Sequence, residues 1–326
     1  MRVSVVMATY NGEAHVAEQL ASILANDRLP DELIVIDDCS TDGTVGVVQK
    51  LLDGHSGMDV IIEVNTTNLG PTATFVKGLL LSTGDLVLTA DQDDICAPEK
   101  ISRMLDAFLA DPQVVMMYSD GVLTDDRLVP TGATIFGTRR RPHLHLGDGR
   151  EPLEIAANPD IKGCTMAMKG SLVRELLART GPSFQPYWGH DHWIALFAFG
   201  LGNVVALKTP LIQHRIHGRN TSAGMRLRPW SAIDLRKWLR GIRKQDADHF
   251  VQRYRRALQQ AEHYGPSFSA PLKKALESLL DLSTRREQLR RLPFFARTKA
   301  VLKIHRDGSY REHYNGVFTL LRDLFL

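Results

Sequence analysis

The chain has 326 residues, of which 44% are hydrophobic and 24% charged, the composition of an ordinary globular protein. Its length allows one large domain or two modest ones. No apolar run approaches the roughly 20 residues that span a bilayer, and no leader peptide precedes the first apolar segment. The sequence therefore predicts neither an integral membrane protein nor a secreted one. Three widely spaced cysteines (Cys39, Cys96 and Cys164) argue against a disulfide framework and a cysteine metal cluster, and favour a reducing, cytoplasmic compartment.

The net charge of +3 is distributed unevenly along the chain. Residues 1–225 carry a net charge of −9, whereas residues 226–326 carry +12. We therefore treat 1–225 as one domain and 226–326 as a separate basic region. The acidic part could hold a cation, and the basic region could meet anionic lipid or nucleic acid. Solvated helices with arginine-rich faces explain the basic region as well.

Up to residue 118 the pattern alternates between strands and helices. Short continuous apolar runs predict strands buried on both faces, at 3–7, 33–36, 60–64 and 86–89. Apolar residues at helical spacing predict helices between these strands, over 16–24, 45–52 and 75–80. A further helix is expected to start at Pro98-Glu99, because proline suits the first helical turn and the helix dipole favours an acidic residue there.

This alternation predicts an open, mostly parallel α/β sheet with helices on both faces. Residues 119–225 are less regular, with a helical pattern from Trp193 to Phe199 and strand patterns at 204–207 and 211–212. From about residue 229 the pattern is helical to the end, with breaks at Pro266, Pro271 and Pro293. We therefore expect a C-terminal helical extension on an α/β domain.

Polar residues follow each of the four predicted strands, and the carboxyl ends of such strands form one edge where ligands bind. The polar groups are Thr9-Tyr10-Asn11, Asp37-Asp38, Asn65 to Asn68 and Asp91-Gln92-Asp93-Asp94. Asp38 and Asp94 could each cap a following helix. Capping explains one carboxylate per cluster and leaves the others to repel one another unless a cation joins them. We favour a divalent cation.

The type of ligand narrows the choice of metal. Oxygen donors without cysteine fit Mg²⁺ or Mn²⁺ better than zinc, and such ions commonly bridge one or two carboxylates and substrate phosphates. No G-x-G-x-x-G fingerprint follows the first strand, and the chain has no Walker A loop. A dehydrogenase and a P-loop NTPase are thereby disfavoured, which leaves an α/β enzyme that handles a nucleotide diphosphate through a metal.

An ordered set of motifs across residues 1–224 resembles glycosyltransferase family 2, and within it the bacterial rhamnosyltransferase-like members. Each motif is weak alone, but their order and spacing together are specific. The set comprises Met7-Ala8-Thr9-Tyr10-Asn11-Gly12, Asp37-Asp38-Cys39-Ser40, Asn68-Leu69-Gly70, Asp91-Gln92-Asp93-Asp94, Tyr118-Ser119-Asp120, Gly163-Cys164-Thr165-Met166, Gly189-His190-Asp191-His192-Trp193 and His214-Arg215-Ile216-His217-Gly218-Arg219-Asn220.

The resemblance implies a GT-A fold, a Rossmann-like and mostly parallel sheet flanked by helices. It further implies an inverting transferase that moves a sugar from a nucleoside diphosphate to a glycan or a lipid-linked acceptor, in cell-surface polysaccharide synthesis such as that of an O-antigen. The donor favoured is dTDP-L-rhamnose, and a UDP-sugar is the alternative.

The matching positions carry expected roles. Thr9, Tyr10 and Asn11, the Asp37/Asp38 pair and Asn68 would bind the nucleotide. Asp91 and Asp93 match the family's D-x-D element, with Asp93 a direct metal ligand and Asp91 reaching ribose or metal. Cys39 stands where most relatives have glycine, which puts the local turn geometry in question.

Asp191 aligns with the family's catalytic base. Direct displacement at the anomeric carbon needs a carboxylate that takes the proton of the acceptor hydroxyl. From the residues alone, Asp191 could instead be held structurally by His190 or His192.

Three later residues are weaker candidates for the diphosphate site. His217 lies in a motif from which GT-A enzymes often supply a metal ligand, although a lone histidine is more often structural. Arg215 and Arg219 could neutralise diphosphate charge instead, because guanidinium matches phosphate geometry.

The start of the basic region has the composition of an interfacial amphipathic helix. Over residues 229–244 the apolar positions, Trp230 and Trp238 among them, group loosely apart from the arginines and lysines. The helix could dock on the anionic inner face of the plasma membrane, or pack its tryptophans onto the catalytic domain. Acceptor binding or homo-oligomer contacts are further uses of this region. We expect no nucleic-acid partner, since no reading motif is present.

Three rival functions fit the residues less well. A nucleotidyltransferase that makes the sugar nucleotide normally has a loop rich in glycine and basic residues after its first strand. The segment Thr9–Glu13 is neither glycine-rich nor basic. A non-catalytic sugar-nucleotide-binding protein would need no base, so the run His190-Asp191-His192 argues against it. A metal-dependent phosphohydrolase would require further histidines.

Overall fold

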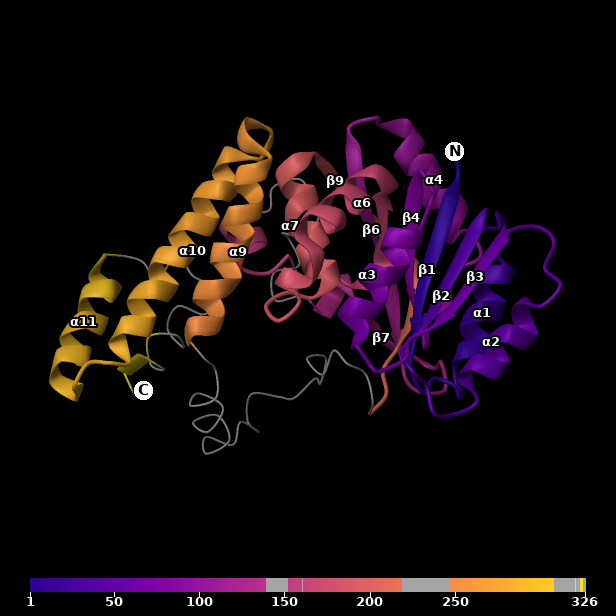
Figure 1. Ribbon diagram of the computed structural model, residues 1–326, viewed down its shortest axis with the longest axis horizontal. Coiled ribbons are helices and arrows are strands. Elements are labelled where there is room, and N and C mark those ends of the chain that lie inside the picture. Colours follow the sequence, from indigo (N-terminus) through magenta and orange to yellow (C-terminus); the bar gives the residue numbers. More distant parts are fainter. Residues whose placement is uncertain (139–151, 160, 219–246, 308–319, 321–322, 325–326) are drawn as a thin grey trace. The chain divides into compact units, whose positions relative to one another are not determined.

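The structure is a computed structural model that describes residues 1–138, 152–159, 161–218, 247–307, 320 and 323–324 (Figure 1). The chain divides into two compact units. The first comprises Met1–Arg150, Asp160–Gln185 and Gly189–Thr221; the second comprises Glu151–Pro159, Pro186–Trp188 and Ser222–Leu326. The domain boundary expected at residue 225 lies outside the described residues. Two short earlier segments that the sequence placed in the first domain belong to the C-terminal unit.

Four parallel strands form one half of the sheet in the first unit, in the order β3-β2-β1-β4. They are β1 (Val3–Thr9), β2 (Glu32–Asp37), β3 (Asp59–Val64) and β4 (Leu86–Asp91). Every residue of β2 is buried, because the strand has a neighbour on each edge and helices on its faces. These are the strands that the continuous apolar runs predict.

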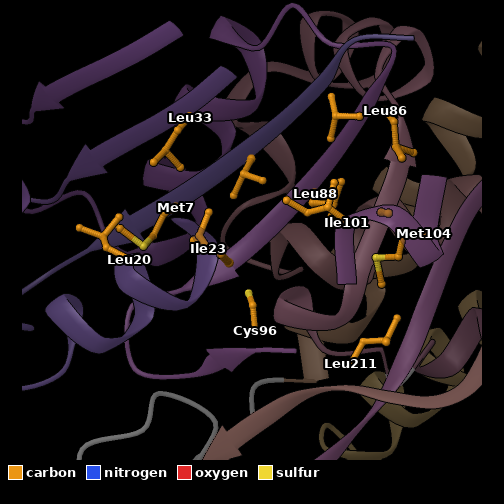
Figure 2. Close-up of a cluster of buried hydrophobic side chains, with 14 of the residues drawn as sticks. Met7, Leu20, Ile23, Leu33, Leu86, Leu88, Cys96, Ile101, Met104 and Leu211 are labelled. Carbon is orange, nitrogen blue, oxygen red and sulfur yellow. The ribbon is translucent and has the colours of Figure 1, made fainter. Parts of the chain in front are cut away.

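Four helices alternate with these strands, and their apolar faces close the core. They are α1 (Val16–Leu24), α2 (Thr44–Leu52), α3 (Pro71–Leu81) and α4 (Lys100–Ala110). Figure 2 shows Leu20 and Ile23 of α1 in the same buried cluster as Met7 and Leu33 of the sheet. The fourth helix begins two residues later than predicted, since the Lys100 amide hydrogen-bonds the Ala97 carbonyl in a turn that contains Pro98 and Glu99.

The second half of the sheet is mixed, and the sheet continues in the order β4-β8-β6-β9-β5, with β7 on β6. Strand β8 is antiparallel to β4 and β6, whereas β9 runs parallel to β6. These strands are β5 (Ile95–Cys96), β6 (Val114–Thr124), β7 (Pro130–Thr134), β8 (Met166–Lys169) and β9 (Asn203–Arg215). The other elements are α6 (Gly170–Thr180), α7 (His190–Leu201) and the short 3-10 turns η1 (Phe136–Thr138), η3 (Gly163–Thr165) and η4 (Gly181–Phe184). The two strands expected at 204–207 and 211–212 are one long strand.

The second unit is helical. It contains α5 (Pro152–Ala157), α9 (Ala247–His263), η7 (Gly265–Ser267), α10 (Ala270–Leu289) and α11 (Phe294–Arg306). Within it the Trp188 indole donates to the Arg253 carbonyl (3.1 Å), and the Arg253 guanidinium lies 3.8 Å from the centre of the indole ring. No helix in the described ranges has both the length and the apolar character required to cross a bilayer. The amphipathic helix predicted over 229–244 lies outside these ranges.

Candidate active site

The Asp91–Asp94 run follows β4 and meets the end of β9. The Asp93 carboxylate Oδ2 lies 2.7 Å from Nε2 of His217, and both side chains retain 14% exposure. The structure therefore brings two of the expected metal ligands together from positions 124 residues apart in sequence. A carboxylate and an imidazole that stay partly open to solvent form a donor set that suits Mn²⁺.

Gln92, between the two aspartates, ties this loop to the end of β1. Its side-chain oxygen accepts the Tyr10 amide (2.8 Å), and its side-chain nitrogen donates to the Tyr10 carbonyl (3.0 Å). Gly12 leaves the space for this side chain, because a Cβ at Gly12 would stand 2.1 Å from Oε1 of Gln92. Gln92 thus fixes the position of the carboxylates on either side of it, a role that the sequence reasoning missed.

Asp91 lies in an electrostatic environment that disfavours its charged form. Burial of the Asp91 carboxylate and the negative charges of Asp94 and Asp93 raise its pKa from the usual 3.8 to about 7, and the charge of Asp191 adds to the effect. A bound divalent cation would relieve this repulsion. The arrangement of Asp91, Asp93 and His217 therefore fits the metal that the sequence predicts.

Asp94 faces inward and makes no cap for α4. Its Oδ1 accepts hydrogen bonds from Nδ1 of His214 (2.9 Å) and from the Arg215 amide (3.1 Å), and its Oδ2 is buried without a hydrogen-bond partner. Burial of the imidazole lowers the His214 pKa, but the Asp94 carboxylate outweighs this and raises it overall. The carboxylate thus joins β9 to the Asp91–Asp94 loop.

Cys164 lies beside this pair, so that one ligand atom from each of Asp94, Cys164 and His214 falls within 4.8 Å of the others. The sequence, which argues against a cysteine metal cluster, did not indicate that Cys164 would lie beside Asp94 and His214. Burial and the Asp94 charge raise the pKa of the Cys164 thiol well above its usual value. The Lys100 ammonium donates to the Cys164 carbonyl (2.8 Å). With a neutral thiol, a nearby cation and a 2.9 Å histidine–carboxylate contact, we interpret this group as a hydrogen-bonded network.

Arg215 is buried and makes its contacts within the protein. Its Nε donates to the Asp93 carbonyl (2.9 Å) and its Nη1 to the Asp126 carbonyl (2.8 Å), while Nη2 pairs with the Glu18 carboxylate. These contacts indicate that Arg215 holds the Asp93 loop in place, and they argue against the predicted contact with diphosphate. Arg219, the other predicted cation, lies outside the described residues.

Asp191 occupies the first turn of α7. Its Oδ1 accepts a hydrogen bond from the His192 amide (2.8 Å). Gly163 lies against the same helix start. The Gly163 carbonyl accepts a hydrogen bond from the hydroxyl of Thr89 on β4 (2.6 Å). Burial pushes the Asp191 pKa upward, but the charges of His192 and His190 and the amide hydrogen bond lower it overall. Asp191 is therefore ionised at neutral pH and near enough to Asp91 for their charges to interact.

Lys162 is a cation of this site for which the sequence offered no signal. Its positive charge contributes to the lowered pKa of Asp191 and opposes protonation of His214. The side chain is partly exposed and directly precedes the η3 turn. Lys162 thus lies close enough to Asp191 and His214 for its charge to act on both, and it would attract an anionic substrate group.

The Asp37 carboxylate is buried at the end of β2. It accepts hydrogen bonds from the hydroxyls of Thr9 (2.7 Å) and Ser40 (2.6 Å), and from the Ser40 amide (2.7 Å). Thr9 is also buried, so it reaches Asp37 and contributes to the site through that contact.

The Asp38 carboxylate is held by the loop that leads into α3, and not by the helix near residue 42. It accepts the amides of Leu69 and Gly70, each at 2.8 Å, and the side-chain amide of Asn65 at 2.9 Å. Although burial acts to raise its pKa, these hydrogen bonds lower it overall. Asn68, the other predicted nucleotide contact of this loop, is exposed.

The turns beside these carboxylates use unusual backbone conformations. Asn11 has a φ of 45° and its side chain accepts the Thr41 amide (2.8 Å), which joins the β1 and β2 ends. Cys39 has a φ of 66°, in the left-handed region that favours glycine. Cys39 thus occupies a backbone conformation that is strained for a residue other than glycine. Tyr10 is 46% exposed at the same edge.

Comparisons with known proteins agree with this architecture. Residues 4–157 match the model of the family "Glycosyl transferase family 2". An uncharacterized glycosyltransferase of Nostoc sp. is 26% identical over 224 residues, which cover 68% of this chain and 66% of that protein. The dTDP-rhamnosyl transferase RfbG of Shigella flexneri is 33% identical over 107 residues, which cover 32% of this chain and 37% of that protein. The chain thus covers less than two thirds of the length of either relative.

Among solved structures, the mannosyltransferase PcManGT from Pyrobaculum calidifontis, determined in complex with GDP-Man and Mn²⁺, superposes with a TM-score of 0.53. The match covers 99% of this chain and 84% of that one at 20% sequence identity, and at this identity it bears on the fold. The family match, the curated relatives and the GT-A fold agree that residues 4–157 form a domain of glycosyltransferase family 2.

Proposed function

We propose that the protein is an inverting, metal-dependent glycosyltransferase that uses a nucleoside-diphosphate sugar. One observation carries the proposal: Asp91, Asp93, His217 and Asp191 come from three separate parts of the chain and meet at the carboxyl edge of the sheet. This edge is where open α/β sheets bind ligands. An ionised base lies beside carboxylates that repel one another and that a cation would neutralise. This arrangement suits the departure of a diphosphate from a sugar.

Asp93 and His217 would hold the cation, with Asp91 completing the set or reaching the ribose. When bound, the ion would supply positive charge for the departing diphosphate. The protein's own contribution is to hold these ligands in place: Arg215 fixes the Asp93 carbonyl, and Gln92 fixes the loop to β1. Lys162 would add a second positive charge near the diphosphate.

Asp191 would act as the base. The acceptor oxygen forms the new bond to the anomeric carbon, its proton passes to the Asp191 carboxylate, and the bond to the diphosphate oxygen breaks. A single displacement of this kind inverts the configuration at the anomeric carbon. The lowered pKa of Asp191 keeps the carboxylate ionised at neutral pH, as a proton acceptor must be.

For the donor we propose dTDP-L-rhamnose, with a UDP-sugar as the alternative. The likeness to the dTDP-rhamnosyl transferase RfbG supports the first, and the Mn²⁺ and GDP-Man complex of the structural neighbour supports a metal-bound nucleotide sugar in general. The carboxylates of Asp37 and Asp38 each accept three hydrogen bonds within the protein, so their part in nucleotide binding would be to hold the loops of the nucleotide site in place.

For the acceptor we propose a glycan or a lipid-linked oligosaccharide in cell-surface polysaccharide synthesis. The enzyme would then work in the cytoplasm, peripherally at the inner face of the plasma membrane. The chemistry asks only for a nucleophilic hydroxyl within reach of Asp191, so the identity of the acceptor rests on the family relationship.

The test is release of nucleoside diphosphate from UDP-, dTDP- and GDP-sugars, with Mn²⁺, with Mg²⁺ and with EDTA, for the wild type and Asp191→Asn. We expect metal-dependent release by the wild type and a loss of at least about 10²-fold in the variant, since removal of a general base costs about 10²–10⁴-fold. A wild type that turns over none of the donors with any acceptor, or that instead joins a nucleoside triphosphate to a sugar phosphate, would overturn the proposal.

A further inference from the structure

Helix α11 in the C-terminal unit has two faces of different character. Its inner face carries Val301 and Ile304, which are buried against Leu282 and Leu289 of α10. These aliphatic contacts anchor the helix, and the Arg285 guanidinium of α10 pairs with Asp307, the residue that follows α11, at 2.7 Å. The other face is turned away from α10.

Two phenylalanines at the start of α11 are exposed. Phe295 is 82% exposed, the highest value among the large hydrophobic residues in the described part of the chain, and Phe294 is 59% exposed. Their rings contact each other edge to face with centres 5.7 Å apart. Leu302, at 45% exposure, extends the apolar surface along the helix. Exposed aromatic rings are costly in water, so a grouped set marks a contact surface.

The charges around these rings are all of one sign. Residues 294–306 contain Arg297, Lys299, Lys303 and Arg306, and no aspartate or glutamate. Lys299, Lys303 and Arg306 are exposed and follow Phe295 at spacings of 4, 8 and 11 residues, which place them on the same helical face. Within residues 294–306, the exposed face thus joins aromatic rings to cations with no acidic residue on the helix itself.

We propose that this face of α11 docks on an anionic lipid surface, with the Phe294 and Phe295 rings entering the headgroup boundary and the three cations meeting lipid phosphates. Exposed aromatic residues flanked by Lys and Arg are the composition that binds such interfaces. A second copy of the chain is a poorer occupant. A twofold contact would place the same face against itself, and therefore cation against cation.

This inference rests on the peripheral membrane location proposed above and names the surface responsible for it, which is distinct from the residue 229–244 segment singled out in the sequence. It can be tested without enzymatic turnover, so its failure can be distinguished from a failure of the proposed sugar transfer.

The experiment is co-sedimentation of the full chain with vesicles of phosphatidylcholine alone and with added phosphatidylglycerol. Phe294→Ser/Phe295→Ser removes the rings, and Lys299→Glu/Lys303→Glu reverses two charges. The matched controls are Leu109→Ser, at an apolar side chain that is 56% exposed on α4, and Lys50→Glu/Lys208→Glu, at exposed lysines of the first unit. Each variant is checked by its thermal melt in the absence of lipid.

We expect the wild type to bind anionic vesicles and to release them as salt rises. Each surface lysine near anionic lipid is worth about a fivefold change in partitioning, so reversing two should weaken binding by at least about 25-fold. The serine variant should weaken it about tenfold or more. Both controls should bind as the wild type does.

Three outcomes would overturn the proposal. The first is equal binding to neutral and anionic vesicles, or to neither. The second is wild-type binding by both α11 variants, which would place any membrane contact elsewhere in the basic region. The third is a change of oligomeric state in the serine variant without lipid, which would identify the face as a contact between copies.

Discussion

Two loops at the carboxyl edge of the sheet both begin with neighbouring aspartates, but the surroundings of these carboxylates differ. After β2, the carboxylates of Asp37 and Asp38 each accept three hydrogen bonds from amides or hydroxyls. After β4, Asp91 has neighbouring carboxylates that raise its pKa, and Asp94 keeps one oxygen buried without a partner. The carboxylates of the first loop find their hydrogen-bond partners within the chain, whereas those of the second loop still require positive charge.

The difference separates structural carboxylates from those held ready for a ligand. An anion that receives amide hydrogen bonds stabilises the fold and gains little from a cation. Carboxylates that face one another cost stability until a cation arrives. Substitutions in the two loops should therefore have opposite signatures in activity, in stability and in response to metal.

The largest expected effect comes from Asp93→Asn. Removing this charge should reduce metal-dependent diphosphate release by at least about 10²-fold, the loss typical when one electrostatic stabiliser is removed. It should also abolish the rise in melting temperature caused by Mn²⁺, while leaving the metal-free melt close to that of the wild type. Asp53→Asn, at an exposed aspartate after α2, is the control. A variant that keeps the Mn²⁺ response would remove Asp93 from the metal site.

Asp38→Asn should do the reverse. The amide cannot accept all the donors of Leu69, Gly70 and Asn65, so the free energy of unfolding should fall by about 2–3 kcal/mol, as for hydrogen bonds to a charged group. The Mn²⁺ response should persist. Because the folded-state pKa of Asp38 is lowered, its stabilisation is present above the usual carboxyl pKa and is lost as the pH falls through the lowered one. Urea melts from pH 7 downward should therefore converge for the two proteins in acid; parallel curves would contradict this account.

The pH dependence of metal binding sharpens the contrast. The pKa of Asp91 is raised, so its contribution to stability without metal is fully present below the usual 3.8 and is lost as the pH rises through about 7. Metal must displace that proton. Mn²⁺ affinity should therefore weaken about tenfold between pH 8 and pH 6, since one pH unit below the pKa corresponds to about 1.4 kcal/mol. Calorimetric titration at the two pH values is the measurement, and an unchanged Kd would argue against protonation of this group.

The smallest effect is expected at Cys39. Glycine would adopt the left-handed backbone without strain, which for other residues costs about 1–2 kcal/mol, partly offset by the greater freedom of glycine in the unfolded chain. Cys39→Gly should raise the free energy of unfolding by up to about 1 kcal/mol and leave diphosphate release unchanged. Cys39→Ala keeps the strain and serves as the control; equal gains from both would point to the thiol instead.

The sequence predicted β1, β2 and β4 because each is largely buried and reads as an apolar run, whereas β3, at the edge of the sheet, is only half-buried and its run is interrupted by Glu63. It missed β5, β6, β7 and β8; the four residues of β8 include two methionines and an alanine, which carry little strand signal, and β5 is only two residues long. The grouping of Asp91, Asp93 and His217 could be expected from strand ends and from family motifs. Which carboxylates are already satisfied could not be predicted, because the partners of Asp38 are main-chain amides about 30 residues away. The contacts of Arg215 and the place of Lys162 likewise depend on tertiary packing.

The paired hydrogen bonds between Gln92 and the Tyr10 main chain have a mechanical consequence. They couple the end of β1 to the Asp91–Asp94 loop, because neither segment can move without displacing the other. A nucleotide that presses on the exposed Tyr10 ring would thereby also move Asp91 and Asp93. Nucleotide recognition and cation capture would then respond to one displacement, and the order in which donor and metal arrive would matter less than their joint presence.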